Sequence, residues 1–270
     1  MECTVEILSI GNELLLGNTF NTNATWIAER VTALGGKVRR ITTVADNLNE
    51  ISQAVSESIK RRPRILITTG GIGPTFDDMT LSGVAKALGL RLKLDNVAVA
   101  MIRQHYARRF PRRRISLTKP RLKMALIPSG GTPILNPVGT APSVRINVNQ
   151  IAIFCLPGVP REAKAIFTRT LAEIIRARAR GRKFLEKWIE VRGIMESSLA
   201  PVLDALMRRS TGVYIKSHPR GIEAGGHPFI HLHFSMSSSN ERKAERVLDQ
   251  AVCEAIEGLS RLGGRVRQIE

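Results

Sequence analysis

The chain has 270 residues, of which 43% are hydrophobic, so it can bury a substantial core and is not expected to be disordered. No apolar run is long enough to span a membrane, and the first ten residues lack the order of a signal peptide. Its three cysteines form no CxxC pair, which argues against a disulfide framework or a zinc site and, with the other features, predicts a cytoplasmic protein.

The formal net charge of +18 is unevenly distributed. Residues 1–180 hold 27 of the 41 basic residues but only 12 of the 23 acidic ones, and no acid lies between Asp95 and Glu162. Such a charge field attracts nucleic acid or a polyanionic small ligand, but a solvated basic surface accounts for it equally well.

Strands and helices alternate in the first 90 residues. The apolar pattern predicts strands at 5–10, 38–44 and 65–67, with helices at 24–34, after Asn49, and at 81–88. This alternation predicts an α/β fold, a three-layer sandwich in which helices cover both faces of a mainly parallel sheet. Ligands of such sheets bind at the carboxyl ends of the strands, so a site is expected in the loops after the strands.

The second half of the chain is less regular at first. Residues 91–150 are rich in Arg, Pro and Gly, and we interpret them as an elaboration whose basic stretch at 108–123 lies beside the pocket. A buried strand at 151–156 and a helix follow. A polar run at 176–183 then predicts a boundary between domains at 1–176 and 184–270, the second of which is expected to be a small α+β domain.

The strongest motif is the loop TTGGIGPT at 68–75, which is followed by Asp77, Asp78 and a helix. Glycines at 70, 71 and 73 beside a helix N-terminus offer backbone N–H groups to phosphate oxygens. The loop is neither a Walker A motif nor a GxGxxG motif. If Asp78 or Thr80 only capped the helix, the three glycines, the proline and the two acids would stay unexplained.

Two carboxylates are the main candidates for catalysis and metal binding. Asp46 follows the second predicted strand and is expected on the same rim of the sheet as Asp78. Such a pair can hold Mg²⁺ against phosphate oxygens or orient an attacking water. Glu13 is a weaker candidate for a third ligand, and Asp46 alone is more often a turn or cap residue.

The remaining candidates for phosphate or substrate binding lie in loops that follow strands or precede helices. Turn formation alone would also account for several of them. His231 and His233 alternate on one predicted strand without an acidic or cysteine neighbour, which favours solvent-facing residues over a metal site. The candidate binding residues are Gly70, Gly71, Gly73, Pro74, Thr75, Asn23, Gly139, Thr140, Pro157 and Gly158.

Five segments carry a family resemblance: SIGNELLLGNTFNTNATWIAERV from Ser9, VADN at 44–47, TTGGIGPTFDDMT at 68–80, NPVGTAP at 136–142 and LPGVPREAK from Leu156. Together they resemble the family of MogA, MoaB and the CinA N-terminal domain, which has the molybdopterin-binding-like fold. GNELLLG, PTxDDxT and LPGVP indicate the CinA branch. The tail, with GIMES from Gly193, is similar to the small KH-like middle domain of CinA proteins.

The resemblance implies that the chain binds a nucleotide or pterin phosphate with a divalent metal, expected to be Mg²⁺. CinA-type N-terminal domains are associated with ADP-ribose pyrophosphatase activity, which we expect here. MogA-like relatives adenylylate molybdopterin, so molybdopterin binding or adenylyl transfer in molybdenum cofactor biosynthesis is the alternative. Ser82 stands where the family usually has a Glu, so the metal arrangement is not expected to be unchanged.

Three further expectations follow. CinA proteins often carry a C-terminal nicotinamide mononucleotide deamidase domain, and the sequence ends before it, so deamidase activity is not expected. A non-enzymatic RNA-binding protein is a minor alternative. KH domains hold RNA through a GXXG loop, which residues 181–270 lack, so nucleic acid is not expected as a partner. Relatives commonly assemble, so a homo-oligomer such as a dimer is expected.

Overall fold

A computed structural model describes residues 2–112, 116–222 and 228–269. Residues 113–115 of the predicted basic stretch lie outside the described residues. The chain forms two compact units, Met1–Ala179 and Arg180–Glu270, which we describe separately as unit 1 and unit 2. None of the helices in the described part of the chain is long and apolar enough to cross a membrane.

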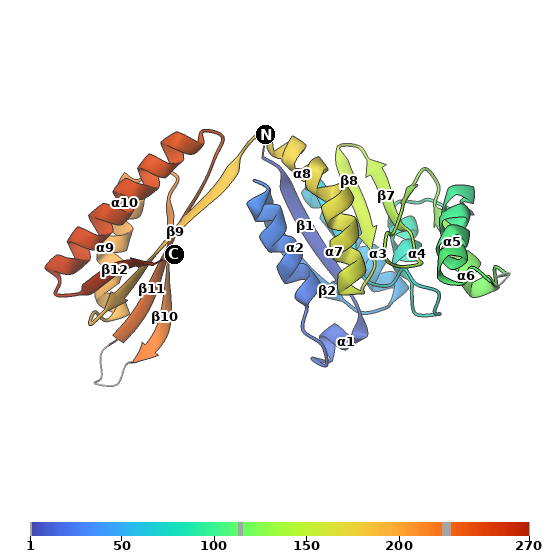
Figure 1. Cartoon of the computed structure of the whole chain (residues 1–270), viewed down its shortest axis with the longest axis horizontal. Helices are drawn as coiled ribbons and strands as arrows, with labels where there is room; N and C mark the ends of the chain where they lie inside the picture. Colours follow the sequence, from blue (N-terminus) through green and yellow to red (C-terminus); the bar gives the residue numbers. More distant parts are fainter. Residues whose placement is uncertain (1, 113–115, 223–227, 270) are drawn as a thin grey trace. The chain divides into compact units, whose positions relative to one another are not determined.

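Unit 1 is built on a six-stranded sheet in the order β2-β1-β3-β8-β7-β6 (Figure 1). The first four strands in this order are parallel, and β7 and β6 continue the sheet in antiparallel fashion. The strands are β1 (Thr4–Ile10), β2 (Lys37–Val44), β3 (Ile65–Thr69), β6 (Thr132–Ile134), β7 (Ser143–Val148) and β8 (Ile151–Leu156).

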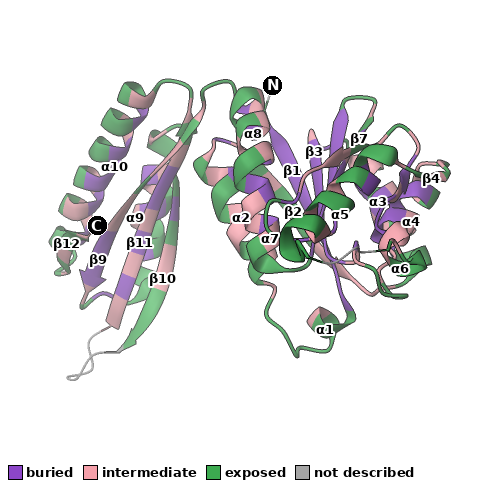
Figure 2. Cartoon of the chain, turned by 45° about the vertical axis from the view of Figure 1, so that its right-hand side comes forward, coloured by how far each residue is buried: buried purple, intermediate pink, exposed green. Residues whose placement is uncertain are grey.

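Alternate residues of the central strands face two separate apolar layers. Leu8 and Ile10 of β1 pack with α3 (Leu48–Arg61), α4 (Thr80–Ala87) and α5 (Asn96–Arg109). Val5 and Ile7 pack on the other side with α2 (Thr22–Ala33), α7 (Pro160–Ile166) and α8 (Ala172–Ala179). Figure 2 shows the buried strands between helices whose outer faces are exposed. The predicted α/β architecture with a mainly parallel sheet is therefore confirmed.

The segment at 91–150 is more regular than its sequence indicates. It contains the 14-residue helix α5, whose buried residues are only Ala98, Val99 and Ile102, so its apolar periodicity is weak. The smaller elements of unit 1 are α1 (Asn12–Leu15), β4 (Leu92–Leu94), α6 (Lys119–Lys123), β5 (Leu126–Pro128) and the π-helical turn η1 (Phe167–Leu171) between α7 and α8.

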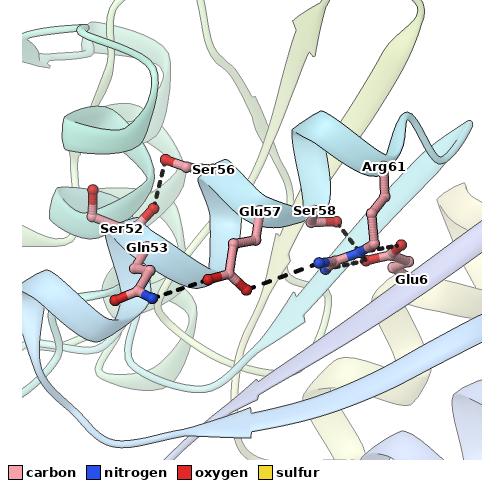
Figure 3. A network of polar contacts seen from close by, with 7 residues as sticks. All are labelled: Glu6, Ser52, Gln53, Ser56, Glu57, Ser58 and Arg61. Carbon is pink, nitrogen blue, oxygen red and sulfur yellow. Dashed lines mark hydrogen bonds and ion pairs between the residues drawn. The ribbon is translucent and has the colours of Figure 1, made fainter.

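One buried carboxylate joins the sheet to α3 (Figure 3). Glu6 is 5% exposed and accepts hydrogen bonds from Ser58 Oγ at 2.9 Å and from Arg61 Nη2 at 2.7 Å. Arg61 Nε also donates to Glu6 Oε1 at 2.9 Å, so the guanidinium holds both carboxylate oxygens. A buried charge is tolerated when it is paired and hydrogen-bonded in this way.

Unit 2 is an α+β unit with an antiparallel sheet in the order β10-β11-β9-β12. Two helices cover one face of this sheet through a core that includes Leu203, Leu232 and Leu248. The KH-like character of this unit stays a prediction. The elements are β9 (Lys183–Arg192), α9 (Glu196–Arg209), β10 (Tyr214–Ile222), β11 (Pro228–Ser238), α10 (Glu241–Arg261) and β12 (Arg265–Ile269).

Candidate functional site

A cleft of about 450 Å³ opens at the carboxyl ends of the parallel strands of unit 1. The loops after β1, β2, β3 and β8 all contribute to it, as expected for a ligand site in a parallel sheet. Tyr106 from α5 and Met124 close another side. Five acids line the cleft, namely Glu13, Asp46, Asp77, Asp78 and Glu162.

The glycine-rich loop is fixed against the end of β1 and the start of α4. Gly70 has a φ of +102°, and a Cβ there would overlap the carbonyl oxygen of Ile10. Gly71 has a φ of +61°, and a Cβ there would overlap the hydroxyl of Thr80. Only glycine meets both demands. Thr80 is fully buried and donates from its hydroxyl to the Gly70 carbonyl at 2.7 Å, so the loop is held in one shape.

The N–H groups of this loop differ in availability. The N–H of Gly70 donates to the carbonyl of Leu156 at 3.1 Å, so it is already used by the fold. The N–H groups of Gly71, Ile72 and Gly73 meet no acceptor among the described residues. The part of the loop that can hold an anion is therefore 71–73, one residue further along than the first predicted glycine.

Asp78 is held by the loop that precedes it and does not cap α4. Its Oδ2 accepts from the N–H of Thr75 at 2.8 Å and from the Thr75 hydroxyl at 2.6 Å. Met79 is the N-cap of α4, without a side-chain capping bond. The Thr75 hydroxyl also contacts Asp77, whose pKa is lowered first by that hydroxyl and then by its own N–H and the charge of Lys123. The capping explanation for Asp78 is therefore wrong.

Asp46 is tied to the loop after β1 by a reciprocal pair of hydrogen bonds. The N–H of Asn12 donates to Asp46 Oδ2 at 2.8 Å, and the N–H of Asp46 donates to Asn12 Oδ1 at 3.2 Å. Burial raises the pKa of Asp46; the Asn12 bond opposes this, and the charges of Glu13, Asp77 and Asp78 raise it further. Asn47, not Asp46, caps α3. Asp46 is thus positioned near the other acids of the cleft.

A second wall of the cleft is organised by Asn136, which is 5% exposed. Its side-chain oxygen accepts from the N–H groups of Val138 and Gly139, and its amide donates to Glu162 Oε2 at 2.7 Å. A Cβ on Gly139 would overlap the Glu162 carboxylate, so this turn requires a glycine for space. Asn23 donates to the carbonyl of Gly158 at 2.7 Å and so fixes the loop after β8.

The structure brings most of the predicted site residues together. Asn23, Thr75 and Gly139 do not line the cleft. Asn23 and Thr75 hydrogen-bond to Gly158 and Asp78, which line it, whereas Gly139 donates to Asn136, which does not. The predicted residues that line it are Glu13, Asp46, Gly70, Gly71, Gly73, Pro74, Asp78, Thr140, Pro157 and Gly158.

Sequence reasoning missed Tyr106 and Glu162 as parts of the site, and it considered the loops that contain Asn12 and Asn136 without selecting these two residues. Glu162 carried a signal, because it is the first acid after a long stretch without one. Asn12 lies beside Glu13 in a loop already expected on the rim. Tyr106 had no signal, since its helix was not predicted.

The metal expected at Glu13, Asp46 and Asp78 stays a prediction. Among the described residues, no three His, Cys, Asp or Glu side chains are arranged to hold a metal ion by themselves. The second oxygens of Asp46 and Asp78 have no donor within the described part of the chain. This donor set fits a hard divalent cation that takes its other ligands from water and substrate phosphates.

The chain belongs to a family of molybdopterin-binding-like domains, because a family model described as a probable molybdopterin binding domain matches residues 6–177. Within it the chain is CinA-like, as its motifs predicted. The chain is similar to CinA, a protein of unknown function from Thermoplasma acidophilum whose crystal structure is known. The two share 41% sequence identity with a TM-score of 0.58, and the match covers 63% of this chain and 98% of that one.

Relatives also match both units together. A protein from Metallosphaera sedula is 41% identical over 268 residues, which is 99% of this chain and 98% of the relative. A protein from Saccharolobus solfataricus is 40% identical over 262 residues, covering 97% of this chain and 94% of the relative.

Proposed function

We propose that the cleft of unit 1 binds the diphosphate of a nucleotide, ADP-ribose or a close analogue, and hydrolyses it with a divalent metal. Water adds across the phosphoanhydride, so that ADP-ribose yields AMP and ribose 5-phosphate. The observation that carries this proposal is the placement of Asp46 and Asp78 beside free loop N–H groups in one cleft. The resemblance of its motifs to CinA-type N-terminal domains, which are associated with ADP-ribose pyrophosphatase activity, supports the same ligand class.

The acids of the cleft are the reason for including a metal. A bare diphosphate would meet five carboxylates, and like charges at close range repel strongly. Mg²⁺ in proteins is commonly held by one or two carboxylates together with substrate phosphates. Asp46 and Asp78 would hold the cation. When bound, it would neutralise charge on the phosphate oxygens.

The chain's own residues would bind and orient the substrate. The N–H groups at 71–73 would donate to a phosphate oxygen, and Asp46, with its raised pKa, would accept a hydrogen bond from the attacking water. Thr75 would keep the Asp78 carboxylate turned into the cleft. Tyr106 lies with the Arg121 guanidinium 4.3 Å above its ring centre and would form the wall beside the rest of the nucleotide.

The test is release of AMP from ADP-ribose by the purified chain with Mg²⁺, Mn²⁺ or Co²⁺. Asp78→Asn should lower turnover by about 100-fold or more, because it removes a full charge from the reacting centre. Glu57→Gln is the matched control, since it removes one exposed carboxylate of unit 1 away from the cleft and should change turnover less than twofold. Full turnover of Asp78→Asn would refute the assigned role.

Molybdopterin binding or adenylyl transfer is the second candidate, and the family match to a probable molybdopterin binding domain favours it. It uses the same cleft, so the two differ in substrate. If the chain releases no AMP from ADP-ribose but transfers the adenylyl group of ATP to molybdopterin, this second function replaces the first. A homo-oligomer, expected to be a dimer, stays a prediction that light scattering of the purified chain would test.

A further inference from the structure

One face of the unit 2 sheet is covered by helices, and the other carries ring side chains. Ile189 of β9, Leu232 of β11 and Ile215 of β10 belong to the core beneath α9 and α10. Side chains alternate along a strand, so the residues between them project from the opposite face. That face, which we call the ring face, carries Phe184, Trp188, His218, Phe229, His231 and His233.

The six rings form a continuous cluster. Trp188 and His233 are cross-strand partners whose rings stack at 4.2 Å with an interplanar angle of 19°. The ring centre of His218 lies 5.4 Å from that of Trp188, and the ring centre of Phe229 lies 5.0 Å from that of His231. The whole chain is only 4% aromatic and has five histidines, so this concentration is not expected from composition.

The side chains of His231 and His233 are only 19% and 18% exposed. Both lie on the face of the sheet that α9 and α10 leave uncovered, and packing against Trp188 covers much of each ring.

Cations surround the ring face. Lys216 of β10 and Arg265 of β12 alternate onto it. Arg220 lies at an irregularity of β10 and is placed on this face by its Nε, which is 3.3 Å from His231 Nδ1. Arg192 and Arg267 are held by Glu190, whose pKa the two guanidinium groups lower to about 2, Arg267 contributing most. Among the described residues of the face, five are Arg or Lys and two, Glu186 and Glu190, are acids.

The aromatic rings and the net positive charge of the ring face together indicate which kind of molecule can bind there. A second copy docking with the same face would bring two net positive surfaces together, which like-charge repulsion opposes. A metal lacks a site, since the described residues hold no group of three ligating side chains. Single-stranded nucleic acid suits both features, because unpaired bases stack on aromatic rings while Lys and Arg follow the phosphates. A duplex would keep its bases from the rings.

We propose that the ring face of unit 2 binds single-stranded nucleic acid, with a base extending the stack of Trp188, His218 and His233 and phosphates on Lys216, Arg220 and Arg265. This mode does not use the GXXG loop whose absence argued against a nucleic-acid partner. The proposal is independent of the reaction proposed for unit 1.

The experiment uses the tryptophan of the ring face as its own reporter. The chain has two tryptophans, and Trp26 lies in unit 1 against Phe167, so Trp26→Phe leaves Trp188 as the only one. Oligouridylate of about ten nucleotides, within the usual site size, should quench the fluorescence of this full-length variant. Three phosphate contacts predict a slope of about −2 for log affinity against log salt concentration.

Substitutions separate stacking from general charge. Trp188→Ala should weaken binding of labelled oligouridylate roughly 10-fold, as expected for the loss of one stacked base. Lys216 lies on the surface, so Lys216→Ala should reduce the slope of log affinity against log salt concentration by about 0.7. This variant also keeps the proposal testable if Trp188→Ala does not fold. Arg246→Ala is the matched control, because it removes one cation from α10 on the covered face and should change affinity less than twofold.

Several results would overturn the proposal. One is the absence of fluorescence quenching at roughly 100 µM oligonucleotide in low salt, where even non-specific binding is measurable. The others are equal losses of affinity in Arg246→Ala and Lys216→Ala, and tighter binding of a duplex than of the single strand. Self-association abolished by Trp188→Ala without oligonucleotide binding would instead show that the ring face is a protein interface. Binding of oligodeoxyuridylate supports the proposal too, and a preference for oligouridylate over it would indicate a contact to the 2′-hydroxyl.

Discussion

Replacing Arg61 with Met should destabilise unit 1 by about 3 kcal/mol. The change leaves the Glu6 carboxylate, whose side chain is 6% exposed, with the Ser58 hydroxyl as its remaining side-chain donor among the described residues. Breaking a buried ion pair from one side costs about 3–5 kcal/mol. The Arg61 side chain is 32% exposed, so water can partly replace it, which places the expected loss at the lower end of that range.

The assay is urea unfolding followed by Trp26 fluorescence in a Trp188→Phe background, which reports unit 1 alone. With an m-value of about 2 kcal/mol/M, the midpoint should fall by about 1.5 M while m stays constant. Adding Glu6→Gln to Arg61→Met should recover more than half of the loss, because it removes the unpaired charge.

Glu57→Ala supplies the comparison on the same helix. Glu57 lies 3.9 Å from Arg61 Nη1 with half of its side chain exposed, so its removal should cost less than about 0.5 kcal/mol. A loss below about 1 kcal/mol for Arg61→Met would refute the reasoning, since buried charges of this kind cost more when unpaired. Equal losses for the two variants would refute it as well.

Three further predictions concern the cleft and unit 2. Gly70→Ala should lower the free energy of unfolding, measured by thermal unfolding, by more than about 2 kcal/mol, because Gly70 has a positive φ and a Cβ there would overlap the Ile10 carbonyl. Gly17 also has a positive φ but has open space around it, so Gly17→Ala should cost only about 1 kcal/mol. Thr75→Val removes the hydroxyl that holds Asp78, so Mn²⁺-dependent turnover of ADP-ribose should fall about 10-fold, and Thr75→Ser should restore it. An unchanged Mn²⁺ dependence in Thr75→Val would argue against a role of this hydroxyl in positioning Asp78. The pKa of Glu190 is about 2 in folded unit 2, whereas in the unfolded chain this carboxylate takes up a proton near pH 4.5. Its contribution to the free energy of unfolding of unit 2 is therefore complete above pH 4.5 and is lost as the pH falls toward 2. In the Trp26→Phe background, acid titration of Trp188 fluorescence should show this loss, and adding Glu190→Gln should give a flatter response.

The sequence predicted the fold best where apolar spacing is strong. The alternation at 5–10, 24–34 and 65–67 matches β1, α2 and β3 closely, because these elements are buried on fixed faces. Helix α5 was missed because its few buried side chains are outnumbered by polar ones. Its position depends on packing against the layer that includes Met124 and Ile127, which local periodicity does not record.

The site was predictable to the level of loops but not of contacts. The rule for parallel sheets placed Asp46 and Asp78 on one rim, and the structure brings them near each other. The Asn12–Asp46 bonds join residues 34 positions apart, and Asn23 reaches Gly158 across 135 positions. Such pairings depend on tertiary geometry, so neither residue pair could be matched from spacing alone.

The sign of the charge around the cleft reverses with distance. From far away the chain, at +18, attracts anions and repels free divalent cations, but inside the cleft a ligand meets carboxylates. A diphosphate would therefore be drawn toward the entrance and retained only with its counter-ion. Metal and diphosphate would then arrive as one complex, and the affinity for each would rise with the concentration of the other.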